Sequence, residues 1–211
     1  MHPPAKTLTM TQVLLTAPGA ASQWVQRWSH LVAPGASVLD VACGRGRHVH
    51  WFAARGHPVT AVDRSAEALQ TMAGLAAGGK AQLVLADIEN APWPLLQDGA
   101  AQRFGAVIVT NYLWRALMPI LLESIAPGGV LLYETFAAGN ASVGKPSRPE
   151  FLLQPRELLD WCHGLRVVAF EDGFCDDPPR FVQRIAAVAA RDSDAGAIAA
   201  PAAPMRYLLA A

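Results

Sequence analysis

The chain has 211 residues, which is enough for one domain with a full core, and 52% of them are hydrophobic while 16% are charged. Its 17 basic and 17 acidic side chains cancel, which argues against nucleic acid as a partner, because phosphate-backbone binding needs clustered positive charge. The three cysteines, Cys43, Cys162 and Cys175, have no paired spacing, so we expect neither a disulfide framework nor a metal site, but a reducing, cytoplasmic location. No apolar run approaches the ~18 residues of a membrane-spanning helix, so we expect no membrane partner.

Prolines, glycines and capping residues divide the chain into an arm (1–21), a domain (22–190) and an Ala-rich tail (191–211) that we expect to be disordered. Within the domain, helical periodicity and caps predict helices at 22–32, 48–54, 65–73, 114–126 and 155–162. Short apolar runs predict strands at 38–42, 59–62, 81–86, 104–110, 130–135, 165–171 and 181–189. This alternation predicts an α/β fold, a doubly wound and mostly parallel sheet with helices on both faces.

Two segments near the end of the domain depart from that alternation. Only an acidic turn, 176–179, joins the last two predicted strands, so they must pair antiparallel, since a parallel crossover needs a dozen or more residues. The polar segment 137–156 is unusually long for a connection in a compact domain, and such loops are mostly functional or disordered.

A glycine turn follows the first predicted strand, in the stretch Ser37 to Asp63. Gly44 and Gly46 allow positive φ and a close approach of the backbone to a ligand. Such a turn places helix amides at the carboxyl ends of the strands, where open α/β sheets bind ligands. A carboxylate at Asp63, which ends the next strand, can accept both hydroxyls of a ribose. The stretch therefore predicts a site for an adenosine-containing cofactor.

Two details of the turn distinguish between cofactors. A dinucleotide turn has a third glycine where this chain has Val49. Asp40, at the end of the first strand, would be poorly placed beside a pyrophosphate but well placed for the ammonium of a methionine moiety. The turn therefore favours S-adenosylmethionine over a nicotinamide dinucleotide.

The run Val-Leu-Asp-Val-Ala-Cys-Gly-Arg-Gly resembles the first motif of class I S-adenosylmethionine-dependent methyltransferases, with Ala42 in place of the first glycine. Asp63 resembles their ribose-binding acid, and Asp87-Ile88 their adenine contact. Asn111 resembles a fourth-strand position that reaches methionine or substrate. The cofactor contacts expected from this resemblance are Asp40, Ala42, Cys43, Gly44, Gly46, Asp63, Arg64, Asp87, Ile88 and Asn111.

The resemblance covers roughly residues 20–190 and is nearest to the small tellurite-resistance and thiopurine type, which acts on small molecules. It implies a Rossmann-like, seven-stranded sheet with an antiparallel last strand, in agreement with the turn-linked ending. It also implies S-adenosylmethionine as the methyl donor and a small-molecule acceptor. We expect a monomer or a homodimer.

Methyl transfer from a sulfonium is an in-line displacement, to which positioning contributes most. A soft acceptor needs little base catalysis, whereas an oxygen or amine acceptor can need a general base. Tyr112, Arg115 and Glu134 lie near predicted strand ends and are the candidates for a catalytic role. The sequence does not identify the methyl acceptor.

Three other readings stay open beside the leading one. A nicotinamide-dependent oxidoreductase could use a similar sheet, although Val49 and Asp40 argue against it. An RNA or protein methyltransferase is disfavoured by the neutral charge and by the lack of an added recognition domain. A binding module could also have kept the pocket and lost the chemistry.

Overall fold

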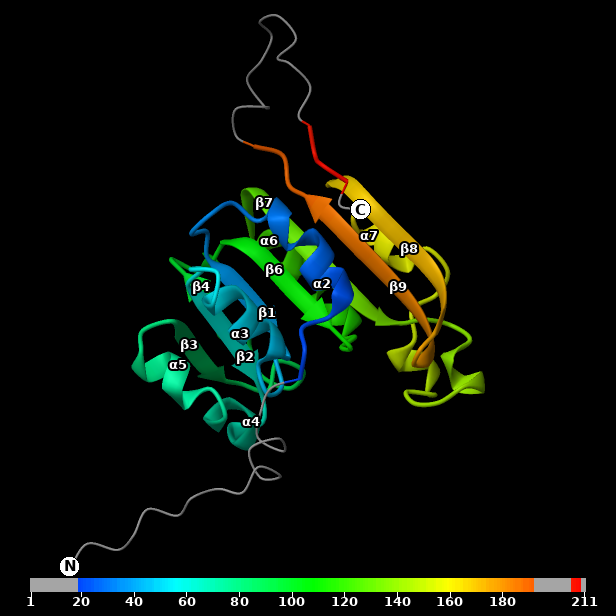
Figure 1. The fold of residues 1–211 in the computed structure, drawn as a ribbon, viewed down its shortest axis with the longest axis horizontal. Helices are drawn as coiled ribbons and strands as arrows, with labels where there is room; N and C mark the ends of the chain where they lie inside the picture. The colour runs from blue at the N-terminus through cyan, green and yellow to red at the C-terminus, as the bar shows by residue number, and fades with distance from the viewer. Residues whose placement is uncertain (1–18, 192–205, 210–211) are drawn as a thin grey trace, which may run out of the picture.

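The computed structural model describes residues 19–191 and 206–209, which form a three-layer α/β fold (Figure 1). Seven strands form one sheet in the order β3-β2-β1-β6-β7-β9-β8. They are β1 (Val38–Val41), β2 (Val59–Asp63), β3 (Ala81–Leu85), β6 (Phe104–Thr110), β7 (Ile125–Phe136), β8 (Arg166–Asp176) and β9 (Pro179–Val188). A separate two-stranded ribbon, β4 (Leu96–Gln97) with β5 (Ala100–Ala101), was not expected from the sequence.

The direction of the strands confirms the predicted topology. β1, β2, β3, β6 and β7 are parallel to their neighbours in that group. β9 is antiparallel to both β7 and β8, so the last strand of the chain is inserted between two strands that run the other way. The fold is therefore the Rossmann-like, seven-stranded arrangement that the resemblance implied.

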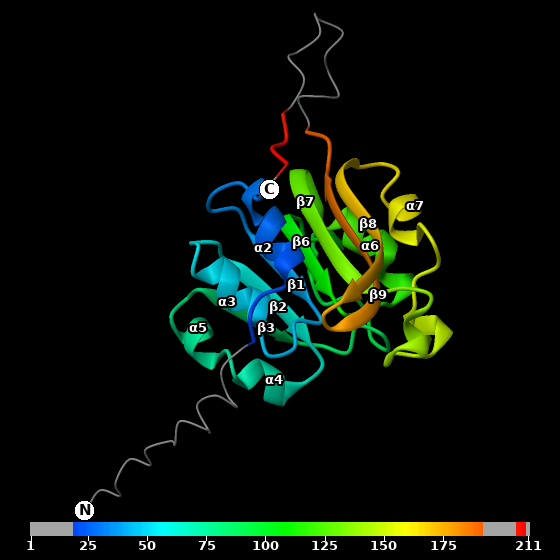
Figure 2. The same ribbon diagram turned by 45° about the vertical axis from the view of Figure 1, so that its right-hand side comes forward.

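Helices cover both faces of the sheet, which Figure 2 shows as a layer between them. α2 (Gln23–Trp28) and α3 (Arg47–Ala53) pack on one face, and α6 (Met118–Glu123) and α7 (Glu157–Trp161) on the other. α4 (Ala66–Gln70) and α5 (Ala73–Ala77) follow β2. Short 3₁₀ turns complete the connections: η1 (Ser29–Leu31), η2 (Arg115–Leu117), η3 (Asn140–Ser142) and η4 (Pro149–Phe151).

Several helices are shorter than the sequence predicted. Ser22 and Ser65 do cap helices, since their hydroxyls accept from the amides of Trp24 and Ala68. The segment 22–32, however, ends in η1, and the helix expected at 65–73 is two short helices. Between residues 114 and 126 the chain begins with η2, and α6 ends at Glu123.

β7 begins at Ile125, five residues before the predicted start. The Pro-Gly-Gly that was expected to precede the strand lies inside it, because the register with β6 shifts between Phe104 and Ala106 and the extra residues bulge out. Gly128 takes φ +73° there, which suits a glycine. β8 likewise runs on to Asp176, so the acidic turn is reduced to Asp177-Pro178.

The arm at 1–21 and the tail at 191–211 lie largely outside the described residues. At the arm's end, Ala21 is buried. Within the tail, Tyr207 packs against the core on the α2 face, and the backbone oxygen of Leu208 lies 3.0 Å from Nε2 of His30. Among the described residues no helix is long and apolar enough to cross a membrane.

Candidate functional site

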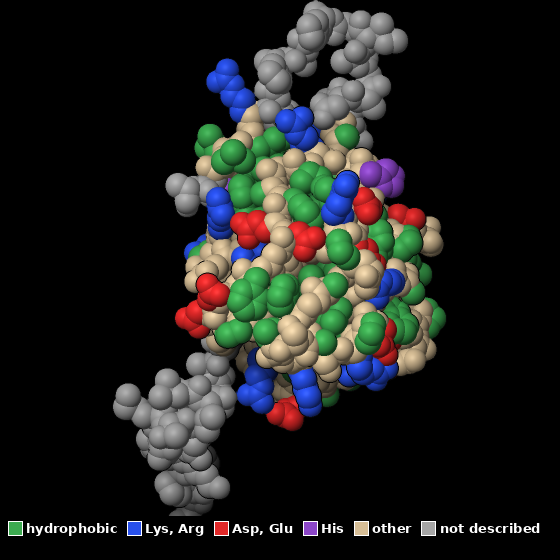
Figure 3. Space-filling view, turned by 90° about the vertical axis from the view of Figure 1, so that its right-hand side faces the viewer, with side chains coloured by type: hydrophobic (Ala, Val, Ile, Leu, Met, Phe, Trp, Pro, Cys, Tyr) green, Lys and Arg blue, Asp and Glu red, His purple; other side chains and the backbone are tan. Residues whose placement is uncertain are grey.

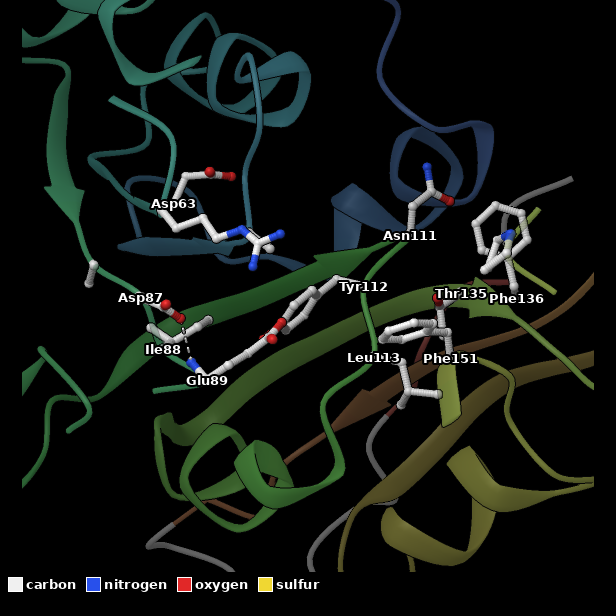
Figure 4. Close-up of a pocket in the computed structure, with 14 residues that line it drawn as sticks. Asp63, Asp87, Ile88, Glu89, Asn111, Tyr112, Leu113, Thr135, Phe136 and Phe151 are labelled. Atoms are coloured by element: carbon white, nitrogen blue, oxygen red, sulfur yellow. Dashed lines mark hydrogen bonds between the residues drawn. The ribbon is translucent and has the colours of Figure 1, made fainter. Parts of the chain in front are cut away.

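A cavity of about 330 Å³ opens at the carboxyl ends of the parallel strands (Figure 4). Every strand end that was expected to hold the cofactor contributes to it, together with two residues of the 137–156 segment. Its lining consists of Ala42, Asp63, Arg64, Ala86, Asp87, Ile88, Glu89, Asn111, Tyr112, Leu113, Thr135, Phe136, Pro146 and Phe151.

The glycine turn has the left-handed backbone that its sequence predicts. Ala42, Gly44 and Gly46 take φ values of +52°, +54° and +78°. A side chain at Gly46 would meet Met72, since a Cβ there would lie 1.9 Å from its Sδ. A Cβ at Gly46 would therefore displace the buried Met72 side chain, whereas a Cβ on Gly44 would meet nothing within 4 Å. The backbone of Ala42 is strained, because its positive φ is a conformation that glycine adopts more easily than alanine.

Asp63 ties the end of β2 to this turn. Its Oδ2 accepts from the amide of Gly44 at 2.7 Å, and its Oδ1 accepts from the amide of Ser65 at 2.8 Å. Each carboxylate oxygen has a second lone pair. Both bonds fix the carboxylate in the cavity wall, where those lone pairs can accept ligand hydroxyls.

Asp87 follows β3 and is held in a similar way. Its oxygens accept from the side-chain amide of Asn90 at 2.9 Å and from the backbone amide of Glu89 at 3.2 Å. These bonds, that of Asn90 foremost, hold the pKa of Asp87 below its ordinary value, so it is ionised at neutral pH. Ile88 is buried and gives an apolar wall next to this acceptor. A polar edge beside an apolar wall can hold an adenine ring.

A second cavity, of about 270 Å³, adjoins the first, because Ala42 and Asn111 line both. The rest of its lining is Gly19, Cys43, Gly44, Arg45, Arg47 and Thr110. Nη2 of Arg47 donates to Oγ1 of Thr110 at 3.2 Å, which places the guanidinium over this cavity. The sequence reasoning missed Arg47, although a cation at the start of a cofactor-binding helix was a signal for an anionic ligand group.

Asp40 lies beneath the turn and lines neither cavity, which corrects the expectation that its side chain faces the cofactor. It is 1% exposed, and the amide of Val49, near the N-terminus of α3, donates to it. Burial raises the pKa of Asp40 to about 8. Asp40 thus supplies the capping acceptor that Gly46, at the N-cap of α3, lacks.

Two neighbours of Asp40, His48 and Cys43, are also buried. Nε2 of His48 accepts from the backbone amide of Ser22 at 3.2 Å, and burial lowers the pKa of His48 to about 3, so the ring is neutral. Burial raises the pKa of the Cys43 thiol, whose Sγ donates to the carbonyl of Gly44 at 3.6 Å. Cys43 therefore contributes packing and backbone to the turn, not a thiolate. Among the described residues no cluster of His, Cys, Asp or Glu could hold a metal ion.

The three candidate catalytic residues separate in space. Tyr112 lines the first cavity, where burial and the Glu89 carboxylate raise the pKa of its hydroxyl, so it stays protonated and is no base. Glu134 is buried on the α2 side, 2.7 Å from Nε of Arg184, and its Oε1 accepts from the hydroxyl of Ser22. Arg115 binds Glu157 and two backbone carbonyls. Neither Glu134 nor Arg115 lines the cavity, which corrects their expected catalytic role.

Comparisons with known proteins relate the sequence and the fold to methyltransferases. Residues 38–129 match the family model described as a methyltransferase domain. The chain is 33% identical over 111 residues to malonyl-[acyl-carrier protein] O-methyltransferase of Serratia marcescens, a match that spans 51% of this chain and 41% of that protein.

The fold is also found in solved structures. TehB from Haemophilus influenzae superposes with a TM-score of 0.62 at 18% identity, over 76% of this chain and 59% of that one. The 1,6-didemethyltoxoflavin-N1-methyltransferase of Burkholderia thailandensis, solved with 1,6-didemethyltoxoflavin and S-adenosylhomocysteine, gives 0.58 at 18% identity, over 79% and 76%. Residues 38–129 are thus similar to a methyltransferase domain, and the fold is similar to that of solved S-adenosylmethionine-dependent methyltransferases.

Proposed function

We propose that this protein transfers a methyl group from S-adenosylmethionine to a small-molecule acceptor. The observation that carries the proposal is the convergence of Ala42, which begins the left-handed turn, with Asp63 and Asp87 on one cavity at the strand ends. The cofactor would supply an activated methyl group on its sulfonium. The chain would supply the positioning, which can contribute about 7–11 kcal/mol in well-oriented pairs.

Each part of the cofactor has a chemically suited partner. Asp87 and Ile88 would hold the adenine, and Asp63 would accept the ribose hydroxyls. Arg47 would pair with the carboxylate of the methionine moiety in the adjoining cavity. The sulfur would then lie near Ala42 and Asn111, the two residues that line both cavities. The methyl group would face the region of Tyr112 and Thr135.

Calorimetry with S-adenosylhomocysteine tests the cofactor assignment directly. We expect a dissociation constant in the micromolar range, and absence of binding below the millimolar range would remove the proposal. Methyl transfer from labelled S-adenosylmethionine to a panel of small thiols, amines and acids then tests activity. Cofactor binding without any transfer would favour a binding module.

A nicotinamide oxidoreductase is the alternative from another enzyme class. Val49 occupies the position of the third glycine and is fully buried in the hydrophobic core between α3 and the sheet. Arg47 and the turn could still meet a phosphate. Enhancement of NADH fluorescence on mixing would favour this alternative, and we expect none.

The location and assembly of the protein are part of the same proposal. Cys43, Cys162 and Cys175 are all free thiols, which fits a reducing, cytoplasmic setting. Basic and acidic side chains are interspersed on the face of Figure 3, which fits a small acceptor better than a nucleic acid. Light scattering on the purified protein would test the expected monomer or homodimer.

A further inference from the structure

The first cavity has two chemically different halves (Figure 4). Its charged lining, which is Asp63, Arg64, Asp87 and Glu89, lies together on the side of β2 and β3. Beyond Tyr112 the lining is apolar. We call Leu113, Phe136, Pro146 and Phe151 the far wall. The polar side chains beside it, among the described lining residues, are those of Asn111, Tyr112 and Thr135, and they are uncharged.

Half of the far wall comes from the 137–156 segment, which is anchored to the sheet. The amide of Ala138 donates to the carbonyl of Leu153, and the amide of Leu153 donates to that of Phe136. Asn140 is 1% exposed and binds at both ends of its amide: Nδ2 donates to the carbonyl of Pro146 at 3.0 Å, and Oδ1 accepts from the amide of Phe181 at 3.1 Å. Asn140 therefore fixes the position of Pro146.

Arg115 fixes the other residue of that segment. Its guanidinium donates to the carbonyls of Glu150 at 2.8 Å and Leu152 at 2.9 Å, the two residues that flank Phe151. The same group makes a bidentate pair with Glu157, at 2.6 and 2.9 Å. Glu157 in turn accepts from the amide of Gln154 at 2.8 Å. One side chain from the β6–α6 connection thus holds the backbone on both sides of Phe151.

We propose that Arg115 is a positioning residue that holds Phe151 in the far wall, and that this wall selects an uncharged, apolar acceptor. The inference rests on the proposed function, because it identifies the far wall with the acceptor subsite. A charged acceptor would lose its hydration among four apolar side chains and would find only uncharged polar groups, such as the Thr135 hydroxyl, beside them. The charged half across Tyr112 holds three carboxylates, those of Asp63, Asp87 and Glu89, against one cation, Arg64, so an anionic acceptor would also meet a net negative charge.

The selection is tested with three probes of one shape: benzyl alcohol, benzoate and benzylamine. Ligand-observed NMR titrations with saturating S-adenosylhomocysteine would measure each affinity. We expect benzyl alcohol to bind at least fivefold more tightly than either charged probe. Tighter binding of benzoate or benzylamine, or no binding of benzyl alcohol at millimolar concentration, would overturn the proposal.

The role of Arg115 is tested in the same assay. Arg115→Gln should weaken the binding of benzyl alcohol at least fivefold and change the affinity for S-adenosylhomocysteine by less than twofold. Arg115→Lys should recover part of the lost affinity for benzyl alcohol. Phe151→Ala, at a side chain 37% exposed, should weaken the probe to the same degree without a folding defect. Arg27→Gln, which breaks an Arg–Glu pair far from the cavity, should change neither affinity.

Hydrogen exchange gives a readout that does not depend on any ligand. The amides of Phe151 and Leu152 donate to the carbonyls of Arg148 and Pro149, and Arg115→Gln should speed their exchange. Unchanged exchange and probe affinity in Arg115→Gln would overturn the positioning role. Repeating the probe titrations without S-adenosylhomocysteine separates the two proposals. If the cofactor does not bind, the proposed function fails, but the probe affinities still show whether the far wall selects an uncharged ligand.

Discussion

The carboxylate of Asp63 accepts a hydrogen bond of 2.7 Å from the amide of Gly44, a residue 19 positions earlier in the chain. This bond joins the end of β2 to the glycine turn that follows β1. The same carboxylate lines the cavity at the strand ends. One side chain therefore shapes the turn and presents a hydrogen-bond acceptor to the ligand.

Replacing Asp63 by alanine should weaken the binding of S-adenosylhomocysteine by about 1–3 kcal/mol, the scale of a lost hydrogen bond to a charged group. Calorimetry at neutral pH would measure the change. Glu67→Gln is a matched control, because Glu67 lies on the next helix and its side chain is 84% exposed in a pair with Arg45. An affinity of Asp63→Ala equal to that of the wild type would exclude Asp63 from the site.

Alanine at Gly46 should destabilise the fold more than alanine at Gly44. Both residues have positive φ, which costs an alanine about 1–2 kcal/mol. At Gly46 the new methyl group also collides with Met72, which adds about 1–3 kcal/mol of overpacking. Urea unfolding of both variants would give the difference, and equal losses would show that Met72 moves away without cost.

Removing the guanidinium of Arg47 should affect only ligands that carry a carboxylate. Arg47→Gln should weaken the binding of S-adenosylhomocysteine by about 1.5–3 kcal/mol, the range for hydrogen bonds to charged groups. The affinity for adenosine should stay unchanged. Paired calorimetric titrations of the two ligands would measure this. Arg55→Gln, whose guanidinium stacks on Trp51, is the control. Equal losses for both ligands would mean that Arg47 supports the turn instead.

Asp40 should make the stability of the free protein depend on pH. Its pKa is about 8 in the folded state against 3.8 as a free side chain, because burial disfavours the charged form. Between these values the folded state holds a proton that the unfolded state has lost. The free energy of unfolding therefore falls as pH rises, by at most about 1.4 kcal/mol per pH unit from this group.

The variant Asp40→Asn should remove that dependence, while its Oδ1 can still accept from the amide of Val49. Thermal unfolding at pH 5 and pH 8.5 would compare the two proteins. We expect Asn to stabilise the protein relative to the wild type more at the higher pH than at the lower, because pH 5 lies only slightly above the pKa of 3.8 at which the loss begins. The same pH dependence in both proteins would assign it to another group.

The sequence predicted the order and type of most elements because apolar runs and caps are local signals. Val38–Val41 and Val59–Asp63 are strands within a residue of their predicted limits. The predictions were wrong where strand pairing outweighs a local turn signal. The Pro-Gly-Gly of β7 was expected to precede the strand, but it forms a bulge within β7, where the register with β6 shifts. The exposed ends of β8 and β9 have no apolar pattern, and only their mutual pairing extends them to Asp176 and Pro179.

The sequence by itself determined the fold class, the glycine turn and the strand-end acids, because backbone conformation and hydrophobic periodicity depend on residues that are close in the sequence. Only the tertiary structure decided which side chains meet the ligand. Glu134 follows the buried strand residue Tyr133, but alternation along β7 turns it toward Arg184 and away from the cavity. Arg115 meets Glu157 across 42 positions, and Asp40 caps a helix instead of facing the cofactor. These partners come together only when the sheet and its helices assemble, so no local sequence pattern predicts them.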